Sequence, residues 1–168
     1  KYTNHFNNDE FNKVVPDWFN NFRSNGLNCF QNIGIPKITD EDWRFTNLND
    51  FLSNDFYPVN ILVNEFDVSD LPDFLARLDA YFIFVVNGAL VYSADLQFKV
   101  SSLKDSIIND DQNFKKIILD QFSSRNKDFF YELNCAFLKN GVYIEIEQSQ
   151  RIQKPIVIVN KFDSNSSD

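Results

Sequence analysis

Apolar side chains recur at helical spacing along the first part of the chain. The pattern begins at Pro16, which a first helical turn tolerates, and ends at Gly34, a residue typical of helix C-termini. Its apolar positions are Trp18, Phe19, Phe22, Leu27, Phe30 and Ile33. The pair Asn25-Gly26 weakens the middle of this pattern by about 1 kcal/mol. We therefore expect either one helix in which Gly26 permits close packing, or two helices that meet there.

Two further helical patterns lie in the second half of the sequence. The first has apolar positions at Phe114, Ile117, Ile118 and Phe122. Asp110 and Asp111 are expected to open it, because acidic groups are favoured at a helix N-terminus. The second has apolar positions at Phe129, Phe130, Leu133, Ala136 and Phe137. Asn140-Gly141 is its predicted stop, and Asn134 is predicted to be a buried amide that needs backbone partners.

Weaker signals predict shorter helical segments. Residues 1–13 are expected to form a loose arm or a short first helix, and residues 103–109 one or two turns. A short helix or turn is expected over residues 40–53, with Thr39 as its N-cap. Residues 69–78 carry apolar positions three and four apart, so another helix is expected there.

Strand-like runs occupy the remaining apolar positions. Residues 80–86 and 89–92 flank Asn87-Gly88, and an Asn-Gly pair between two such runs is a strong hairpin signal. After Gly141 the apolar period changes from 3.6 to 2, and Pro155 opens another run over residues 156–159. Further short strands are predicted at residues 59–63 and 100–102. This mixture of elements predicts an α+β fold.

The last two strands set the expected domain organisation. They come at residues 141–168, with little sequence after them to cover their faces or pair their edges. We therefore expect an N-terminal helical or α+β domain over residues 1–140, followed by the first strands of a truncated second domain. The sequence contains no methionine, so we expect its first residue not to be a translational start.

The charge of the chain narrows the classes of partner. The 168 residues carry 16 Lys and Arg against 24 Asp and Glu, a formal net charge of −8. Nonspecific nucleic-acid binding and adsorption to an acidic membrane both depend on basic surfaces, so neither is expected. No apolar run approaches the ~20 residues that a transmembrane helix needs, and no secretory signal opens the chain.

Recognisable catalytic and metal motifs are missing from the sequence. Its four glycines form no phosphate-binding loop, and no G-x-S-x-G, H-E-x-x-H or C-x-x-C occurs. Cys29 and Cys135 are too far apart for a metal spacing, and we expect reduced core thiols in a cytosol-like compartment. His5 is the one histidine, so metal ligation or base catalysis by imidazole is not expected.

Two polar clusters carry alternative interpretations. Glu145 and Glu147 would share one strand face, where they form either a solvated surface or a cation site. Arg44 stands between Trp43 and Phe45 and is expected to stack on an aromatic ring and pair with a carboxylate of the same domain. The functional alternative for Arg44 is an anionic ligand.

Two motifs resemble the SufB/SufD family of iron–sulfur cluster assembly proteins. The first is similar to its "G-x-P…E-x-W-[KR]-Y-T-N-L" segment and uses Gly34, Pro36, Glu41, Trp43, Arg44, Thr46, Asn47 and Leu48. The second is similar to "F-x-x-L-N-x-A…G-V-x-[IL]…P-I-x-[IL]" and uses Leu133, Asn134, Gly141 and Pro155. The resemblance spans residues 16–160. Thr46-Asn47-Leu48 favours the SufD branch, and Phe45 departs from the usual Tyr.

The resemblance implies a fold and a role for the chain. It implies an N-terminal region that leads into a right-handed parallel β-helix, with residues 141–168 as the first strands. It implies a non-catalytic, cytoplasmic or plastid scaffold subunit that acts with SufB and the ATPase SufC, with SufE and SufS as candidate partners. The iron–sulfur cluster, and a flavin, would belong to the full complex. The motif residues are then structural, with no catalytic, cofactor or metal residue among them.

Two other classes of protein remain as alternatives to this reading. A self-contained α+β protein-interaction module would have a compact fold with no unpaired strand edge near Ile158. A small thiol enzyme would use Cys29 or Cys135, exposed and beside a base.

Overall fold

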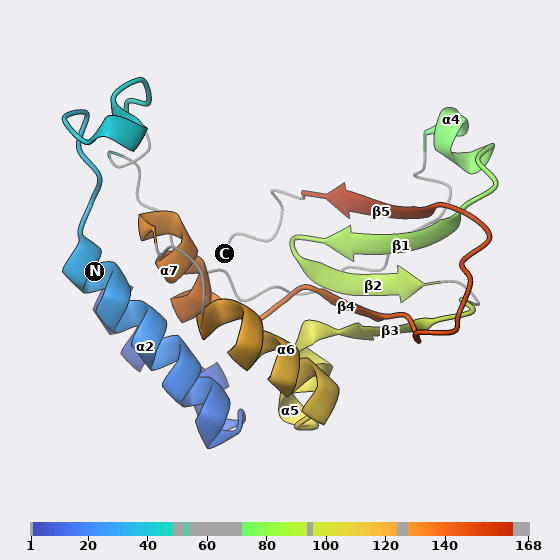
Figure 1. The fold of residues 1–168 in the computed structure, drawn as a ribbon, viewed down its shortest axis with the longest axis horizontal. Coiled ribbons are helices and arrows are strands. Elements are labelled where there is room, and N and C mark those ends of the chain that lie inside the picture. The colour runs from blue at the N-terminus through green and yellow to red at the C-terminus, as the bar shows by residue number, and fades with distance from the viewer. Residues whose placement is uncertain (1, 49–52, 54–71, 94–95, 124–127, 163–168) are drawn as a thin grey trace. The chain divides into compact units, whose positions relative to one another are not determined.

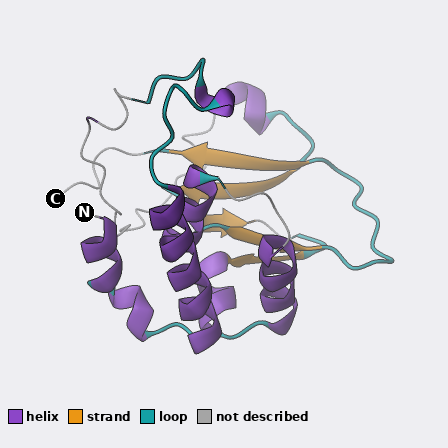
Figure 2. Ribbon diagram, turned by 60° about the vertical axis from the view of Figure 1, so that its left-hand side comes forward, coloured by secondary structure: helices purple, strands orange, loops and turns teal. Residues whose placement is uncertain are grey.

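The computed structural model describes residues 2–48, 53, 72–93, 96–123 and 128–162 (Figure 1). These residues belong to two compact units, of which the first combines Lys1–Pro58 with Asp110–Leu138 and the second combines Val59–Asn109 with Lys139–Asp168. The expected division into residues 1–140 and 141–168 stays a prediction, since the second unit also includes Val59–Asn109. All described strands belong to the second unit (Figure 2).

Helices make up the described part of the first unit. Their bounds are α1 (Tyr2–Asn7), η1 (Glu10–Lys13), α2 (Asp17–Ile33), η2 (Glu41–Trp43), α6 (Gln112–Ser123) and α7 (Phe129–Phe137). α2 is one continuous helix, which confirms the first of the two expectations for Asn25-Gly26. It ends at Gly34, whose φ of 71° and N–H bond to the Phe30 carbonyl form the C-cap.

Apolar residues from both ends of this unit's sequence form its core. Phe6, Leu27, Phe30, Phe129 and Ala136 are buried together, and the rings of Phe30 and Phe129 lie 4.7 Å apart. The N-terminal residues are therefore part of the core, so of the two expectations for residues 1–13 the short helix is correct and the loose arm is wrong.

Side-chain caps set the starts of the two later helices. Asp111 Oδ1 accepts from the N–H groups of Asn113 and Phe114 at 3.0 and 3.1 Å, which confirms the acidic opening of α6. Asp128 Oδ1 accepts from Tyr131 N at 2.8 Å at the start of α7. The predicted stop of α7 is late, since its C-cap is Leu138 in an extended conformation.

Two short segments differ from their predictions. The N-cap of η2 is Asp40 instead of Thr39, and η2 spans three residues of the predicted 40–53 segment. α4 (Asp73–Ala76) is shorter than predicted, and Pro72 is its N-cap. The predicted strand 59–63 and the first residues of the helix predicted over 69–78 lie outside the described residues.

The second unit contains two small sheets and helix α5 (Leu103–Ile108). The three-stranded sheet has the order β2 (Ala89–Ser93), β1 (Tyr81–Val86), β5 (Ile156–Lys161), with β2 antiparallel and β5 parallel to β1. The other sheet pairs β3 (Lys99–Ser102) with β4 (Val142–Glu145) in antiparallel register. The predicted α+β class is confirmed, and the described residues contain no coil of a β-helix.

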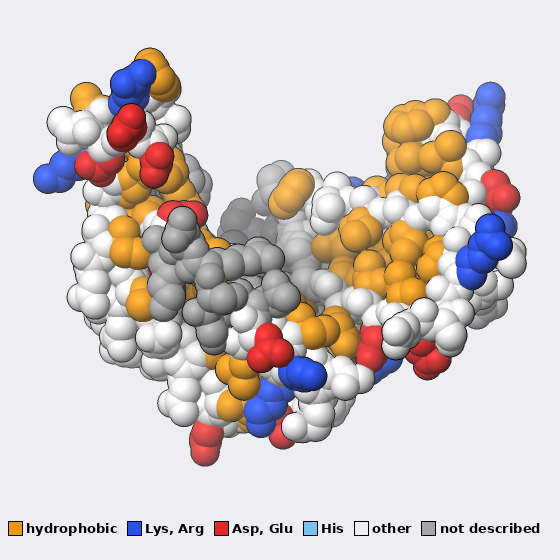
Figure 3. Space-filling view, in the orientation of Figure 1, with side chains coloured by type: hydrophobic (Ala, Val, Ile, Leu, Met, Phe, Trp, Pro, Cys, Tyr) orange, Lys and Arg blue, Asp and Glu red, His pale blue; other side chains and the backbone are white. Residues whose placement is uncertain are grey.

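The core of this unit lies between strands from both sheets. Ile83, Val85 and Phe98 are buried, with Val100 from β3 and Ile144 from β4 packed against them. β5 is an edge strand among the described residues, and its Ile158 is 46% exposed. Figure 3 shows apolar side chains gathered over the three-stranded sheet and around α4, in which Phe74 is 67% exposed. This unit therefore carries both a core and an exposed apolar surface.

The predicted hairpin between β1 and β2 gives a direct test of backbone geometry. Asn87 and Gly88 have φ values of 47° and 86°, as a two-residue turn of this kind requires. Gly88→Ala should lower the free energy of unfolding by about 1–2 kcal/mol, because a Cβ disfavours this conformation. Chemical denaturation followed by circular dichroism measures it. Asn87→Gly is the control, because glycine adopts a positive φ without steric cost, and it should change the free energy of unfolding by less than ~0.5 kcal/mol. Equal losses for the two variants would contradict the view that the backbone conformation of Gly88 disfavours a Cβ.

Candidate functional site

A buried arginine organises the first unit. Arg23 of α2 is fully buried, and its Nη2 lies 2.6 Å from Asp9 Oδ2. Its Nη1 donates to Asn12 Oδ1 at 2.7 Å, and its Nε donates to the Ala136 carbonyl of α7 at 2.9 Å. The guanidinium also lies over the Phe6 ring, 5.1 Å from the ring centre. One side chain thus joins the N-terminal segment, α2 and α7.

Burial and ion pairing act in opposite directions on the pKa of Arg23. Loss of hydration lowers the pKa of Arg23 from its ordinary value, and the hydrogen bond and charge of Asp9 raise it. Because a guanidinium stays protonated near neutral pH, the buried ion pair persists there. Removing one partner of such a pair leaves the other charge buried and uncompensated, so this centre is expected to be essential for the fold.

α2 and α7 approach each other closely at Gly26. A Cβ built at this position would lie 2.8 Å from the Cβ of Cys135 and 2.9 Å from the backbone nitrogen of Ala136. The absence of a side chain at Gly26 therefore sets the distance between the two helices. This is the close packing that was one of the two expectations for the Asn25-Gly26 pair.

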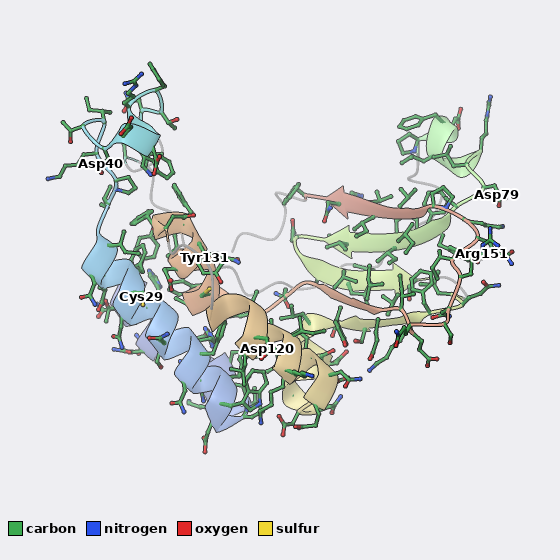
Figure 4. The ribbon with its side chains drawn as sticks, in the orientation of Figure 1. Cys29, Asp40, Asp79, Asp120, Tyr131 and Arg151 are labelled. Carbon is green, nitrogen blue, oxygen red and sulfur yellow. The ribbon has the colours of Figure 1, made fainter. Side chains whose placement is uncertain are left out.

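A cleft of about 380 Å³ lies beside this contact, within the first unit. Its lining residues come from α2, α6 and α7, and they are Trp18, Asn21, Phe22, Asn25, Gly26, Ile118, Leu119, Tyr131, Glu132 and Cys135. Tyr131 projects from α7, next to the segment of α2 that carries Cys29 (Figure 4). The cleft combines apolar walls with amide, phenol and carboxyl groups, so it can hold a side chain that has both apolar and polar parts.

The residues that line the cleft differ in burial. Glu132 is 3% exposed and Cys135 is 2% exposed. Trp18 Nε1 donates to Asp110 Oδ1 at 2.6 Å, and the Lys115 ammonium lies 5.3 Å from the centre of the Trp18 ring. The lining therefore includes a buried acidic residue and an aromatic ring that already has a cation on it.

The buried glutamate was not predicted from the sequence, and Asn134 was predicted wrongly. Asn134 is exposed, whereas Glu132 is buried two residues earlier in α7. A nine-residue helix leaves the phase of its buried face uncertain, and residues of α1, α2 and η2 all pack against α7. The signal that was available was the position of Glu132 between Phe129 and Cys135, both of which are buried.

The first family motif lies mostly on the surface. Trp43 is the exception, since its ring packs 5.6 Å from the Phe130 ring. Arg44 stacks on Phe45, with its guanidinium 4.4 Å from the ring centre, as predicted, but no carboxylate partner of Arg44 is found among the described residues. Among the other motif residues, Gly34, Pro36 and Leu48 are partly exposed. The side chains of Glu41, Thr46 and Asn47 are exposed.

The second family motif is divided between the two units. Leu133 packs against the core of the first unit. In the second unit, the Gly141 carbonyl accepts from Leu103 N at 3.0 Å, and the Pro155 carbonyl accepts from Tyr81 N at 2.8 Å. Gly141 and Pro155 thus accept backbone hydrogen bonds directly before β4 and β5 begin.

The remaining candidate residues form no assembled site in the described structure. Cys135 is buried, as predicted, but Cys29 is only half-buried and lies 3.9 Å from Asn25 Oδ1. Glu145 ends β4 and pairs with Lys99 at 3.1 Å, whereas Glu147 is exposed two residues beyond the strand, so the expectation that the two share a strand face is wrong. His5 lies in α1. The described residues contain no group of three or more His, Cys, Asp or Glu side chains placed to hold a metal ion.

Among the described residues, no helix has the length and apolar character needed to cross a membrane.

Comparison with known proteins identifies the family of the chain. A search of curated proteins returns no match. The family model described as "SufBD protein N-terminal region" matches residues 1–158, nearly the whole sequence. The chain therefore belongs to the N-terminal-region family of the SufB and SufD proteins, the iron–sulfur cluster assembly proteins that its two motifs resemble.

Proposed function

We propose that the chain is the N-terminal part of a SufD-type scaffold subunit, and that it supports iron–sulfur cluster assembly through contacts with partner proteins. The observation that carries the proposal is the surface position of the first family motif. Glu41, Arg44, Thr46 and Asn47 are exposed and contribute little to the core. Thr46-Asn47-Leu48 supports the SufD branch over the SufB branch.

The apolar neighbours of this motif support a contact role. Ile35, Ile38 and Phe45 are 53%, 64% and 87% exposed. Together with Ile33, which is 45% exposed, they form an apolar segment that runs from the end of α2 past η2. Exposed apolar groups of this kind mark sites where another protein binds. A subunit that assembles with others would bury this segment.

A β-helix core that continues from β5 is the second part of the proposal. β5 runs parallel to β1 and exposes Ile158 and, just beyond the strand, Phe162, which is 85% exposed. A parallel strand with an exposed edge and apolar groups can be extended by further strands. In this proposal the residues of β4 and β5 lead into that core.

The partners follow from the resemblance. We propose SufB and the ATPase SufC as the proteins with which the whole subunit assembles, and SufE and SufS as sulfur donors that contact it. The iron–sulfur cluster is the product of the whole assembly, and any flavin belongs to the assembly as well. The proposed role of the chain itself is non-catalytic, in the cytoplasm or in a plastid.

Affinity capture of the whole subunit tests this assignment. The full-length protein is co-expressed with the SufB and SufC of the same organism, with and without residues 1–158. Capture of SufB and SufC by the intact protein is expected, with recovery reduced at least ~10-fold by the deletion. Recovery of neither partner by the intact protein would overturn the assignment. Equal recovery by both forms would overturn the assembly role of this region.

A further inference from the structure

We propose that residues 33–45, called here the η2 segment, bind an amphipathic helix of a partner protein that carries basic residues beside its apolar stripe. The inference rests on the proposed function, in which this segment contacts another protein, and it names the chemistry of that partner. The segment belongs to the first unit. Figure 3 shows apolar and acidic side chains side by side over it, at the upper left. One partner can therefore meet an apolar contact and a charge contact together.

Isoleucines give the η2 segment its apolar contact area. Ile33, Ile35 and Ile38 are 45%, 53% and 64% exposed. A partner helix with apolar residues at i, i+3, i+4 and i+7 presents a continuous stripe that can cover several such side chains. Removing apolar surface from water is the main favourable term in most protein associations. An amphipathic helix therefore suits this row of isoleucines.

Two carboxylates close to the isoleucines in sequence select the charge of the partner. Glu41 and Asp42 are exposed in η2, and no ion pair joins either of them to another described residue. Asp40 is set apart from them, since its Oδ2 accepts from Lys37 N at 2.8 Å. The net charge of −8 adds a long-range attraction for a basic surface. Lysine or arginine on the flank of the partner helix can therefore pair with η2 without breaking an ion pair of the described structure.

Contacts within the first unit hold the η2 segment in place before a partner binds. Trp43 N donates to the Asp40 carbonyl at 3.0 Å, and the Trp43 ring packs 5.6 Å from the Phe130 ring of α7. The Arg44 guanidinium lies over the Phe45 ring, 4.4 Å from its centre, instead of pairing with the carboxylates of η2. A segment that is already ordered loses less conformational freedom on binding. This arrangement favours a specific contact over a loose one.

Model peptides test the proposal on the full-length protein. The basic probe is two copies of Leu-Lys-Lys-Leu-Leu-Lys-Lys, whose leucines fall on one helix face, and its acidic counterpart has glutamate in place of each lysine. Fluorescence anisotropy of the dye-labelled peptides measures both affinities. The basic peptide should bind at least ~10-fold more tightly than the acidic one. Equal affinities, or no binding of the basic peptide, would overturn the proposal.

A pair of apolar variants tests whether the isoleucines form the contact. Ile35→Ser should weaken binding of the basic peptide about fivefold, because the apolar area that the peptide covers is reduced. Val14→Ser is the matched control, since Val14 is 57% exposed in the same unit and lies outside the η2 segment. It should leave the affinity unchanged. Equal losses for the two variants would overturn the proposed position.

A pair of double variants tests the charge contact separately. Glu41→Gln combined with Asp42→Asn should weaken binding of the basic peptide about threefold and reduce its dependence on salt. Glu10→Gln combined with Glu147→Gln removes the same charge at two exposed positions outside the η2 segment, so nonspecific attraction to the acidic chain falls equally. Equal losses for the two double variants would overturn the proposed role of η2.

The peptide titration and the affinity capture of SufB and SufC can fail separately. Capture of both proteins, together with equal effects of the variants and their controls, would overturn the proposed partner chemistry and leave the proposed function in place. Peptide binding that depends on the η2 segment, without capture of either protein, would overturn the proposed function and support the docking segment.

Discussion

Replacing Arg23 with methionine is expected to lower the free energy of unfolding of the first unit by about 3–5 kcal/mol. Methionine fills much of the same volume but breaks the bonds to Asp9, Asn12 and the Ala136 carbonyl. The carboxylate of Asp9, whose side chain is 6% exposed, would then be buried without its cation. Urea denaturation followed by tryptophan fluorescence measures the loss, since both tryptophans lie in the first unit.

The chain offers a matched control for this substitution. Lys13 pairs with Glu10 at 2.7 Å, but the two side chains are 70% and 78% exposed. Lys13→Met should therefore change the free energy of unfolding by less than ~1 kcal/mol. A loss for Arg23→Met that is no larger than the loss for Lys13→Met would contradict the view that Arg23 joins the N-terminal segment to α2 and α7.

Gly26→Ala is expected to destabilise the first unit by about 1–3 kcal/mol, although alanine is the better helix former. The added Cβ would lie 2.8 Å from the Cβ of Cys135 and 2.9 Å from the backbone of Ala136, so α2 and α7 must move apart. The same fluorescence-detected denaturation measures the effect. The sign of the change decides between helix propensity and helix–helix packing.

Asn28→Ala supplies the comparison within the same helix. Asn28 is exposed in α2, so its replacement should stabilise the unit by a few tenths of a kcal/mol through propensity alone. Stabilisation by Gly26→Ala of the same size as by Asn28→Ala would show that the two helices are not held at this distance by Gly26.

Local patterns predicted the longest elements of the fold well. The helical spacing between Pro16 and Gly34 predicted the helix observed as α2. The pair Asn87-Gly88 predicted the hairpin formed by β1 and β2. Both signals come from residues close together in the sequence, where propensity and turn geometry act directly. The pairing of β5 with β1 joins residues more than seventy positions apart, and no local pattern specifies it.

The candidate site depended on contacts between distant residues and was mostly missed. Arg23 bonds to a carbonyl of α7, 113 residues away, and nothing near Arg23 in the sequence indicates that partner. The cleft likewise combines α2 with α6 and α7, so its acidic group could not be assigned from the phase of one helix. The first family motif was found from its residue types, but its surface position came only from the structure.

The composition of the assembled complex tests the central claim most directly. Native mass spectrometry of the full-length protein, co-purified with SufB and SufC, gives the number of copies of each subunit. Under the proposed function, this protein should be present once together with one SufB, and two SufC should be present if each of the two scaffolds binds one ATPase. A complex that contains this protein and SufC but excludes SufB, or no complex at all, would contradict the SufD assignment.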